Sequence, residues 1–254
     1  MKIYVFHTDN NEKLLREWFL PTLKDDYPVI VKKGEQGGYK GVYKEDGWFY
    51  LTTQKIDFVM QAIRENWNEA FIFSDPDIQF FGMISRYLSN IHKKQDMLFQ
   101  RNSFYKNSRI GDLCTGFFLC VGNAKTLNFW QNVKKLIGQN SMDDQDAANY
   151  LLMDYDKLAI RFIRKALDRM HLREWHEQLS RMGLNGYRVK WGYLPREFCS
   201  GSTQTRQLWA PGMELPIPEN IILHHANWTR GIETKVLQLE YVRDMVNKKY
   251  SKRV

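Results

Sequence analysis

The chain has 254 residues, which is enough for one large α/β domain or two small ones. It is 43% hydrophobic and 14% aromatic, as expected of a globular protein. Its formal net charge of +8 suits an anionic ligand such as a nucleotide, and would also suit nucleic acid or an acidic membrane surface. The basic residues from Lys248 to Arg253 are equally well explained as a solvated surface.

Three cysteines, Cys114, Cys120 and Cys199, do not form a disulfide framework and are not at metal-ligand spacing. Residues 1–6 are too short for a signal peptide, and no apolar run approaches the length of a membrane span. We therefore expect a cytoplasmic protein without a transmembrane segment.

Short apolar runs rich in β-branched and aromatic residues predict buried strands. The clearest is 70–73, which is too short and too apolar for a helix. The predicted strands cover residues 2–6, 29–31, 70–73, 97–99, 114–121, 187–191 and 221–228.

Apolar residues at helical spacing predict helices between these strands. The clearest has Ile56, Val59 and Ile63 on one face, and Thr52-Thr53 ahead of them would be its N-cap. Others are expected from Asn10 to Pro21, at 83–91, 127–137, 147–152 and 157–182, and around 236–245. This alternation is typical of α/β folds, and without a visible repeat or linker we expect one domain, 1–254.

Two aspartates, Asp75 and Asp77, follow the strand 70–73 directly. Pro76 between them fixes its own φ and stiffens the corner. In open α/β sheets, ligands bind at the carboxyl ends of strands. Two close carboxylates repel each other unless a cation compensates, and Mg²⁺ or Mn²⁺ with phosphate oxygens would do so. An acidic turn that merely caps a helix remains the alternative.

Other polar groups lie at the ends of predicted elements. Asp143-Asp144-Gln145-Asp146 carries more carboxylates than a helix cap needs. Gly116 sits in an apolar strand, where a backbone or ligand could approach closely. Lys55 lies in the first turn of its predicted helix, where it is either solvated or helps to bind a phosphate. The glycine-rich stretch 34–47 matches no phosphate-binding motif and reads as a loop.

Four groups of residues, in this order, resemble the GT-A-fold nucleotide-diphospho-sugar transferases, a family that includes retaining α-glycosyltransferases. They are Lys55 with Phe73 to Asp77; Phe99 to Asn102 with Cys114 to Phe117; Asp144-Gln145 with Asn149; and His225 to Trp228 with Gly231 and Lys235. The resemblance extends from residue 3 to about residue 240. Pro76 departs from the family, which more often has a small or β-branched residue there, and 157–193 has no counterpart.

The resemblance implies a Rossmann-like GT-A domain with a mixed central sheet flanked by helices. Its nucleotide-binding half would be about 1–100, and 101–254 would serve the donor sugar and the acceptor. It also implies that Asp75, Asp77 and His225 bind Mn²⁺ or Mg²⁺ at the donor diphosphate. An imidazole beside two carboxylates favours Mn²⁺. His224 would point to the opposite face of its strand, and only His225 has the family's offset to Gly231.

The same resemblance assigns the groups around the donor. Lys235 and the backbone of Gly231 would neutralise the leaving diphosphate, and Asp144 and Gln145 would hydrogen-bond the donor sugar, with Gln145 near the anomeric carbon. The catalytic set is thus Asp144, Gln145 and Lys235. The nucleotide would be bound by Phe6, His7, Thr8, Lys55 and Asp75.

The implied reaction is metal-dependent transfer from a nucleotide sugar, which we expect to be a UDP-sugar, to a glycan, protein or small-molecule hydroxyl, with retention. Two alternatives remain. A D-x-D corner also occurs in haloacid-dehalogenase-like phosphatases, although there it follows the first strand of the chain. A non-catalytic module that binds glycan or nucleic acid is the other, but the aromatics do not interleave with basic residues as nucleic-acid binding requires. Trp191, Trp209 and Trp228 could stack on sugar rings or pack in the core.

Overall fold

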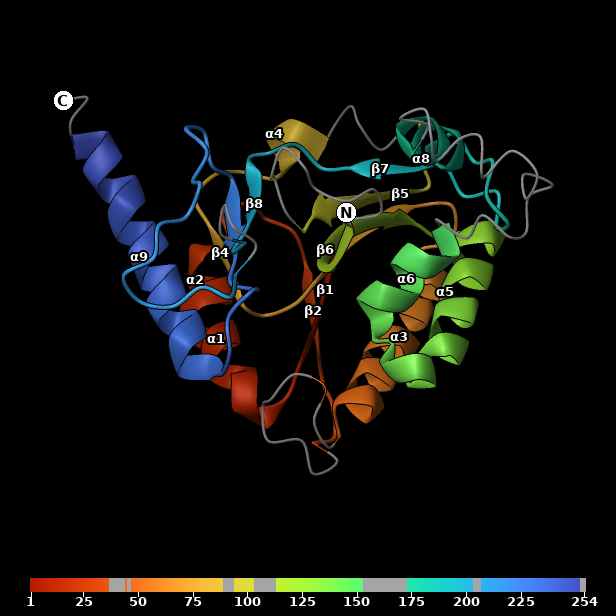
Figure 1. The fold of residues 1–254 in the computed structure, drawn as a ribbon, viewed down its shortest axis with the longest axis horizontal. Helices are drawn as coiled ribbons and strands as arrows, with labels where there is room; N and C mark the ends of the chain where they lie inside the picture. Colours follow the sequence, from red (N-terminus) through yellow and green to blue (C-terminus); the bar gives the residue numbers. More distant parts are fainter. Residues whose placement is uncertain are drawn as a thin grey trace.

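A mixed sheet of six strands forms the centre of the protein in a computed structural model (Figure 1). The model describes residues 1–36, 44, 47–88, 94–102, 113–152, 173–202 and 207–251. The strand order is β2-β1-β3-β6-β5-β7. The strands are β1 (Ile3–His7), β2 (Val29–Lys33), β3 (Ala70–Ser74), β5 (Met97–Arg101), β6 (Leu113–Val121) and β7 (Trp191–Tyr193).

The strands of this sheet run in both directions. β1 is parallel to β2 and β3, and β5 is parallel to β7, whereas β6 is antiparallel to its neighbours β3 and β5. Val5 lies opposite Ser74, so the carboxyl ends of β1 and β3 lie at the same edge of the sheet. The α/β fold with a mixed central sheet, as predicted, is confirmed.

A second, smaller sheet has the order β4-β9-β8. It joins β4 (Ile78–Phe80), directly after the acidic corner, to β8 (Phe198–Ser200) and β9 (Leu223–His225) from far along the chain. β9 pairs antiparallel with β4 and parallel with β8. The sequence predicted neither β4 nor β8. It predicted a strand over residues 221–228, which is longer than β9.

Helices cover both faces of the central sheet. Figure 1 shows α3 (Trp48–Glu65), α5 (Ala124–Leu136) and α6 (Asp144–Leu152) together on one side, and α9 (Ile232–Ser251) beside the N-terminal helical segment on the other. That segment comprises η1 (Asp9–Asn11), α1 (Glu12–Leu14), a π-helical turn η2 (Leu15–Phe19) and α2 (Leu20–Thr22). The remaining helical elements are α4 (Ser85–Leu88), η3 (Gln139–Ser141) and α8 (Arg173–Arg181).

The core follows the alternation of side chains along each strand. Tyr4, Phe71 and Phe73 pack toward α3 and α5, whereas Ile3 and Ile72 pack in a second cluster on the opposite face. Because side chains alternate between the two faces, strands that are covered on both read as continuous apolar runs. This explains why the strands of the central sheet could be predicted from short apolar stretches.

Some helix boundaries differ from the prediction. α3 begins at Trp48, after Gly47 with φ 80°, and not at Thr52-Thr53. The hydroxyls of Thr52 and Thr53 each donate to a carbonyl one turn earlier, at 2.8 Å, so these residues lie inside the helix. The strand predicted at 187–191 is wrong for residues 187–190. The structure instead has β7, which begins at Trp191 and ends at Tyr193. The predicted helices at 83–91 and 157–182 lie partly outside the described residues, as do the loop 34–47 and the end of the basic tail.

All three cysteines are free and buried. Within the described part of the chain, no helix has the length and apolarity that a membrane crossing requires.

Candidate functional site

The acidic corner joins the two sheets. Asp75 follows β3, and its backbone N–H donates to the carbonyl of Gly116 in β6 at 2.7 Å. Asp77 precedes β4, and its carbonyl accepts from the N–H of Ala226, just after β9, at 2.8 Å. The backbone of each aspartate is therefore anchored to a different sheet.

His225 reaches this corner through the pairing of β4 with β9, in which it lies opposite Ile78. Its Nε2 lies 3.3 Å from Oδ1 of Asp77. One ligand atom from each of Asp75, Asp77 and His225 lies within 4.8 Å of the others, which is close enough to hold one cation. Two carboxylates and an imidazole suit Mn²⁺. The structure thus brings together the three residues expected to bind a metal.

Gly116 makes room for this cluster. A Cβ at this position would lie 2.1 Å from Cε1 of His225 and 3.0 Å from Oδ2 of Asp75, so only glycine fits. The ladder between β5 and β6 shifts here, because Phe99 pairs with Phe118 but Gln100 pairs with Cys114. The close approach expected at Gly116 therefore exists, and the groups that approach are the candidate metal ligands.

Two lysines neutralise the carboxylates. Lys55 of α3 is largely buried, and its Nζ lies 2.9 Å from Oδ1 of Asp75 and 3.0 Å from Oδ2 of Asp144. Lys235, in the first turn of α9, forms an ion pair with Asp77. Lys55 is therefore not a solvated helix residue, and it links two carboxylates that the sequence placed in separate roles.

The electrostatics of the two aspartates differ. Burial raises the pKa of Asp75, and the neighbouring Asp77 adds to the rise, while Lys55 opposes it. Burial would also raise the pKa of Asp77, but Lys235 and His225 outweigh it and hold that pKa below its usual value. Burial acts against protonation of His225, yet Asp77 raises the pKa of His225 to about 10. The charged form of Asp77 is thus stabilised by its neighbours, whereas the charged form of Asp75 is disfavoured and would gain from a metal ion.

The acidic stretch before α6 divides into separate roles. Oδ1 of Asp143 accepts from the N–H of Asp146 at 2.7 Å, which is a helix-capping contact. Asp144 instead turns toward the site, where its Oδ2 accepts from the hydroxyl of Thr115 at 2.8 Å and contacts Lys55. Gln145 is half-buried in the first turn of α6 beside it.

The end of β1 lies at the same sheet edge as the acidic corner. Phe6, His7 and Thr8 are all buried, and the His7 carbonyl accepts from the N–H of Gly34 at 2.8 Å. Burial lowers the pKa of His7, and its Nδ1 has no hydrogen-bond partner among the described residues. A buried polar atom without a partner is rare and suits a ligand contact.

Gly231 stands immediately before α9, with φ 76°, and its carbonyl accepts from the N–H of Lys235 at 3.2 Å. A Cβ here would meet no atom within 4 Å, so the left-handed backbone is what favours glycine. Gly231 therefore lies one helical turn before the lysine that contacts Asp77.

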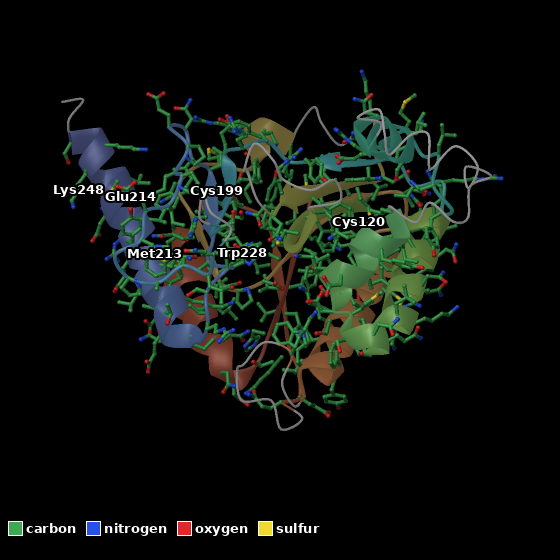
Figure 2. The ribbon with its side chains drawn as sticks, in the orientation of Figure 1. Cys120, Cys199, Met213, Glu214, Trp228 and Lys248 are labelled. Atoms are coloured by element: carbon green, nitrogen blue, oxygen red, sulfur yellow. The ribbon has the colours of Figure 1, made fainter. Side chains whose placement is uncertain are left out.

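The three tryptophans considered as sugar platforms differ in burial. Trp191 and Trp209 are buried core residues. Trp228 is half-buried, and its indole N–H donates to Oδ1 of Asn102 at 2.7 Å. Figure 2 shows Trp228 on the side of the molecule that carries α9. Only Trp228 keeps an accessible face.

Sequence reasoning assigned no role to Gln100, although the structure places it against His225. Its Oε1 lies 2.9 Å from Nδ1 of the imidazole. The available signal was a glutamine at the end of the apolar run 97–99, where an uncharged polar residue must find a buried partner. Which partner it finds depends on a contact between residues 125 positions apart.

Comparisons with known proteins support the fold described above. The sequence profile of the nucleotide-diphospho-sugar transferase family matches residues 22–239. Among solved structures, one similar fold is that of a glycosyltransferase involved in the glycosylation of the major capsid of PBCV-1. That match has a TM-score of 0.50 and 8% sequence identity, and covers 96% of this chain and 100% of the other. No curated protein matches the chain in sequence. With most of its length matched by the profile, this chain belongs to the nucleotide-diphospho-sugar transferase family.

Proposed function

We propose that the protein is a metal-dependent glycosyltransferase that moves a sugar from a nucleotide-diphosphate sugar to an acceptor hydroxyl. The observation that carries this proposal is the cluster of Asp75, Asp77 and His225, whose ligand atoms lie within 4.8 Å of one another at the seam of two sheets. In a member of a nucleotide-diphospho-sugar transferase family, such a cluster suits a cation that holds the donor diphosphate.

The residues present fit Mn²⁺ better than Mg²⁺, because an imidazole completes the oxygen ligands. Asp75, Asp77 and His225 would hold the ion. When bound, it would supply positive charge to the diphosphate as that group leaves. We propose a UDP-sugar as the donor, with the nucleotide held near Phe6, His7 and Thr8.

Lys235 would donate to the leaving diphosphate from the start of α9, where Gly231 ends the preceding loop. Charge that grows on a leaving group is best stabilised by donors already in place. The ion pair of Lys235 with Asp77 keeps the ammonium at the carboxylate that would share the diphosphate's cation.

Asp144 and Gln145 would bind the donor sugar from the first turn of α6. Lys55 and Thr115 fix the carboxylate of Asp144, so it would meet a sugar hydroxyl without reorganising. We propose retention of configuration. In a front-face attack, the leaving phosphate accepts the proton of the acceptor hydroxyl, so the chain need not provide a separate base.

We also propose that residues 1–254 act as a single domain. Leu14 and Trp18 of the N-terminal segment share a buried cluster with Ala226 and Leu239, which come from the end of the chain. A shared core of this kind should unfold with the rest of the protein in one cooperative transition.

Calorimetry with UDP-, GDP- and dTDP-sugars, each with and without Mn²⁺, tests the function. We expect one nucleotide to bind only with Mn²⁺ present, and proton NMR of the product should show the anomeric configuration of the donor. Turnover of p-nitrophenyl phosphate, without binding of any nucleotide sugar, would instead support the phosphatase. Unchanged ligand affinity in Asp75→Ala and His225→Ala, without transfer, would support the binding module.

A further inference from the structure

Gln100 and His225 form a buried polar pair beside the candidate metal cluster. Gln100 is fully buried and His225 is 3% exposed. Gln100 lies at the end of β5, where the ladder to β6 shifts register, and its Oε1 lies 2.9 Å from Nδ1 of His225. Gln100 can therefore orient the imidazole, because among the described residues only Gln100 and Cys114 lie close to Nδ1.

The surroundings of Gln100 fix the orientation of its amide. Its Nε2 donates to the backbone carbonyls of Phe198 at 3.2 Å and Cys199 at 2.7 Å. A carbonyl oxygen only accepts, so the NH₂ group must face these two backbone atoms. The Oε1 atom is therefore the one that faces His225, and it too only accepts.

This orientation fixes a hydrogen on Nδ1 of the imidazole. Because Oε1 of Gln100 only accepts, Nδ1 of His225 must donate. The Sγ atom of Cys114 lies 3.6 Å from the same nitrogen and is at most a weak partner. Nε2 faces Oδ1 of Asp77 at 3.3 Å, and because a carboxylate only accepts, Nε2 also carries a hydrogen in the metal-free protein. Nε2 is the nitrogen that would release its hydrogen to bind a cation, while Nδ1 keeps its hydrogen bond to Gln100.

We propose that Gln100 is a positioning residue, which keeps the hydrogen on Nδ1 of His225 and thereby directs Nε2 at the cation site. The inference builds on the proposed metal dependence but concerns the orientation of the ring itself. A ring flip would lose the bond to Gln100, and the backbone of Gly116 packs against Cε1 of the imidazole. Such outer partners orient metal-binding histidines in many proteins.

A second histidine–glutamine pair offers a matched control. His224 points to the opposite face of β9, and its Nε2 lies 3.2 Å from Oε1 of Gln238 in α9. His224 and Gln238 are both fully buried. Substitution of Gln238 therefore removes a comparable buried amide next to a histidine that is outside the metal cluster.

The test compares Gln100→Leu, Gln100→Glu and Gln238→Leu with the unmodified protein. In calorimetric titrations with Mn²⁺ alone, we expect Gln100→Leu to bind about 10- to 100-fold more weakly. Gln238→Leu should bind Mn²⁺ as the unmodified protein does. Gln100→Glu keeps an acceptor oxygen for Nδ1–H but turns its second oxygen toward the carbonyls of Phe198 and Cys199, so it should restore only part of the affinity.

The ring hydrogens are read separately, by ¹⁵N NMR of metal-free protein with labelled histidine. The spectra are recorded at a pH above the raised pKa of His225, where the ring has lost one of its two hydrogens. The His225 signals are assigned from their loss in His225→Asn. Nδ1 of His225 should carry a hydrogen in the unmodified protein and in Gln238→Leu. An unprotonated Nδ1 would overturn the inference, and so would Mn²⁺ affinity that is unchanged in Gln100→Leu. If Gln100→Leu does not fold, the Mn²⁺ affinity of Gln100→Glu and the NMR measurement still test whether Gln100 positions His225. Failure of the unmodified protein to bind Mn²⁺ counts against the proposed function, while the NMR result judges the role of Gln100.

Discussion

Lys235 forms an ion pair with Asp77, a residue 158 positions earlier in the chain. The pair joins the start of α9 to the corner between the two sheets. In the proposed function, the same ammonium has two potential anionic partners, the Asp77 carboxylate and the donor diphosphate. Metal and lysine would therefore compete for Asp77 when no donor is bound.

This competition predicts opposite effects of Lys235→Ala on two ligands. The affinity for UDP in the presence of Mn²⁺ should fall, because a charge-assisted hydrogen bond worth about 1.5–3 kcal/mol is lost. The affinity for Mn²⁺ alone should rise, because an internal cation no longer occupies Asp77. Calorimetry measures both affinities, and Lys248→Ala on the same helix is the control. A fall in both affinities would contradict the competition.

Lys55→Ala should destabilise the fold. The substitution leaves the buried carboxylate of Asp144 and the half-buried carboxylate of Asp75 without their shared cation, and breaking a buried pair such as Lys55–Asp144 costs about 3–5 kcal/mol. The free energy of unfolding, from urea denaturation, measures the loss. Adding Asp144→Asn removes one of the two unpaired charges and should recover part of it. A loss below 1 kcal/mol, as for an exposed ion pair, would show that Lys55 is solvated.

Gly116→Ala should abolish Mn²⁺ binding, because the added Cβ would lie 2.1 Å from Cε1 of His225 and would displace the ring. Mn²⁺ titration monitored by electron paramagnetic resonance checks this. Gly138→Ala is the control, since its Cβ meets nothing within 4 Å but its φ of 83° strains any side chain. The control should lose about 1 kcal/mol of stability and keep its affinity for Mn²⁺. Equal Mn²⁺ affinity in both variants would exclude the steric role of Gly116.

The thiols should be unreactive in the folded protein. Burial raises the pKa of Cys199 to about 12, and burial also raises the pKa of Cys120. Figure 2 shows Cys199 on the side of the molecule that carries α9, and Cys120 on the side that carries α5 and α6. Because the thiolate is the reactive form, Ellman's reagent should label no cysteine quickly, even at pH 9. After unfolding in guanidinium, all three should react, and one fast thiol in the native protein would contradict this.

The acidic corner and the central sheet could be predicted from sequence because their signals are local. β3 is a short apolar run covered on both faces, and Asp75-Pro76-Asp77 follows it without a gap. The family resemblance added His225, which the structure places opposite Ile78. The N-terminal helical segment was also predicted, but it ends at Thr22, because Pro21 fits the first turn of α2.

Other features could not be predicted, because they depend on pairing between distant segments. β4 and β8 are only three residues long, and each becomes a strand by pairing with β9. The ion pair of Lys55 with Asp144 likewise depends on how α3 and α6 pack, and this packing cannot be predicted from a local sequence pattern. The orientation of Gln100 depends on backbone carbonyls 98 and 99 positions away.

The seam between the sheets has a consequence for how the protein is made. Asp75 and Asp77 leave the ribosome well before β9 and Lys235 do. A nascent chain that has reached Tyr193 already contains every strand of the central sheet, yet its acidic corner still lacks both the imidazole and the ammonium that neutralise Asp77. In the proposed function, the set of metal ligands would therefore be completed only after the scaffold that supports it can already have formed.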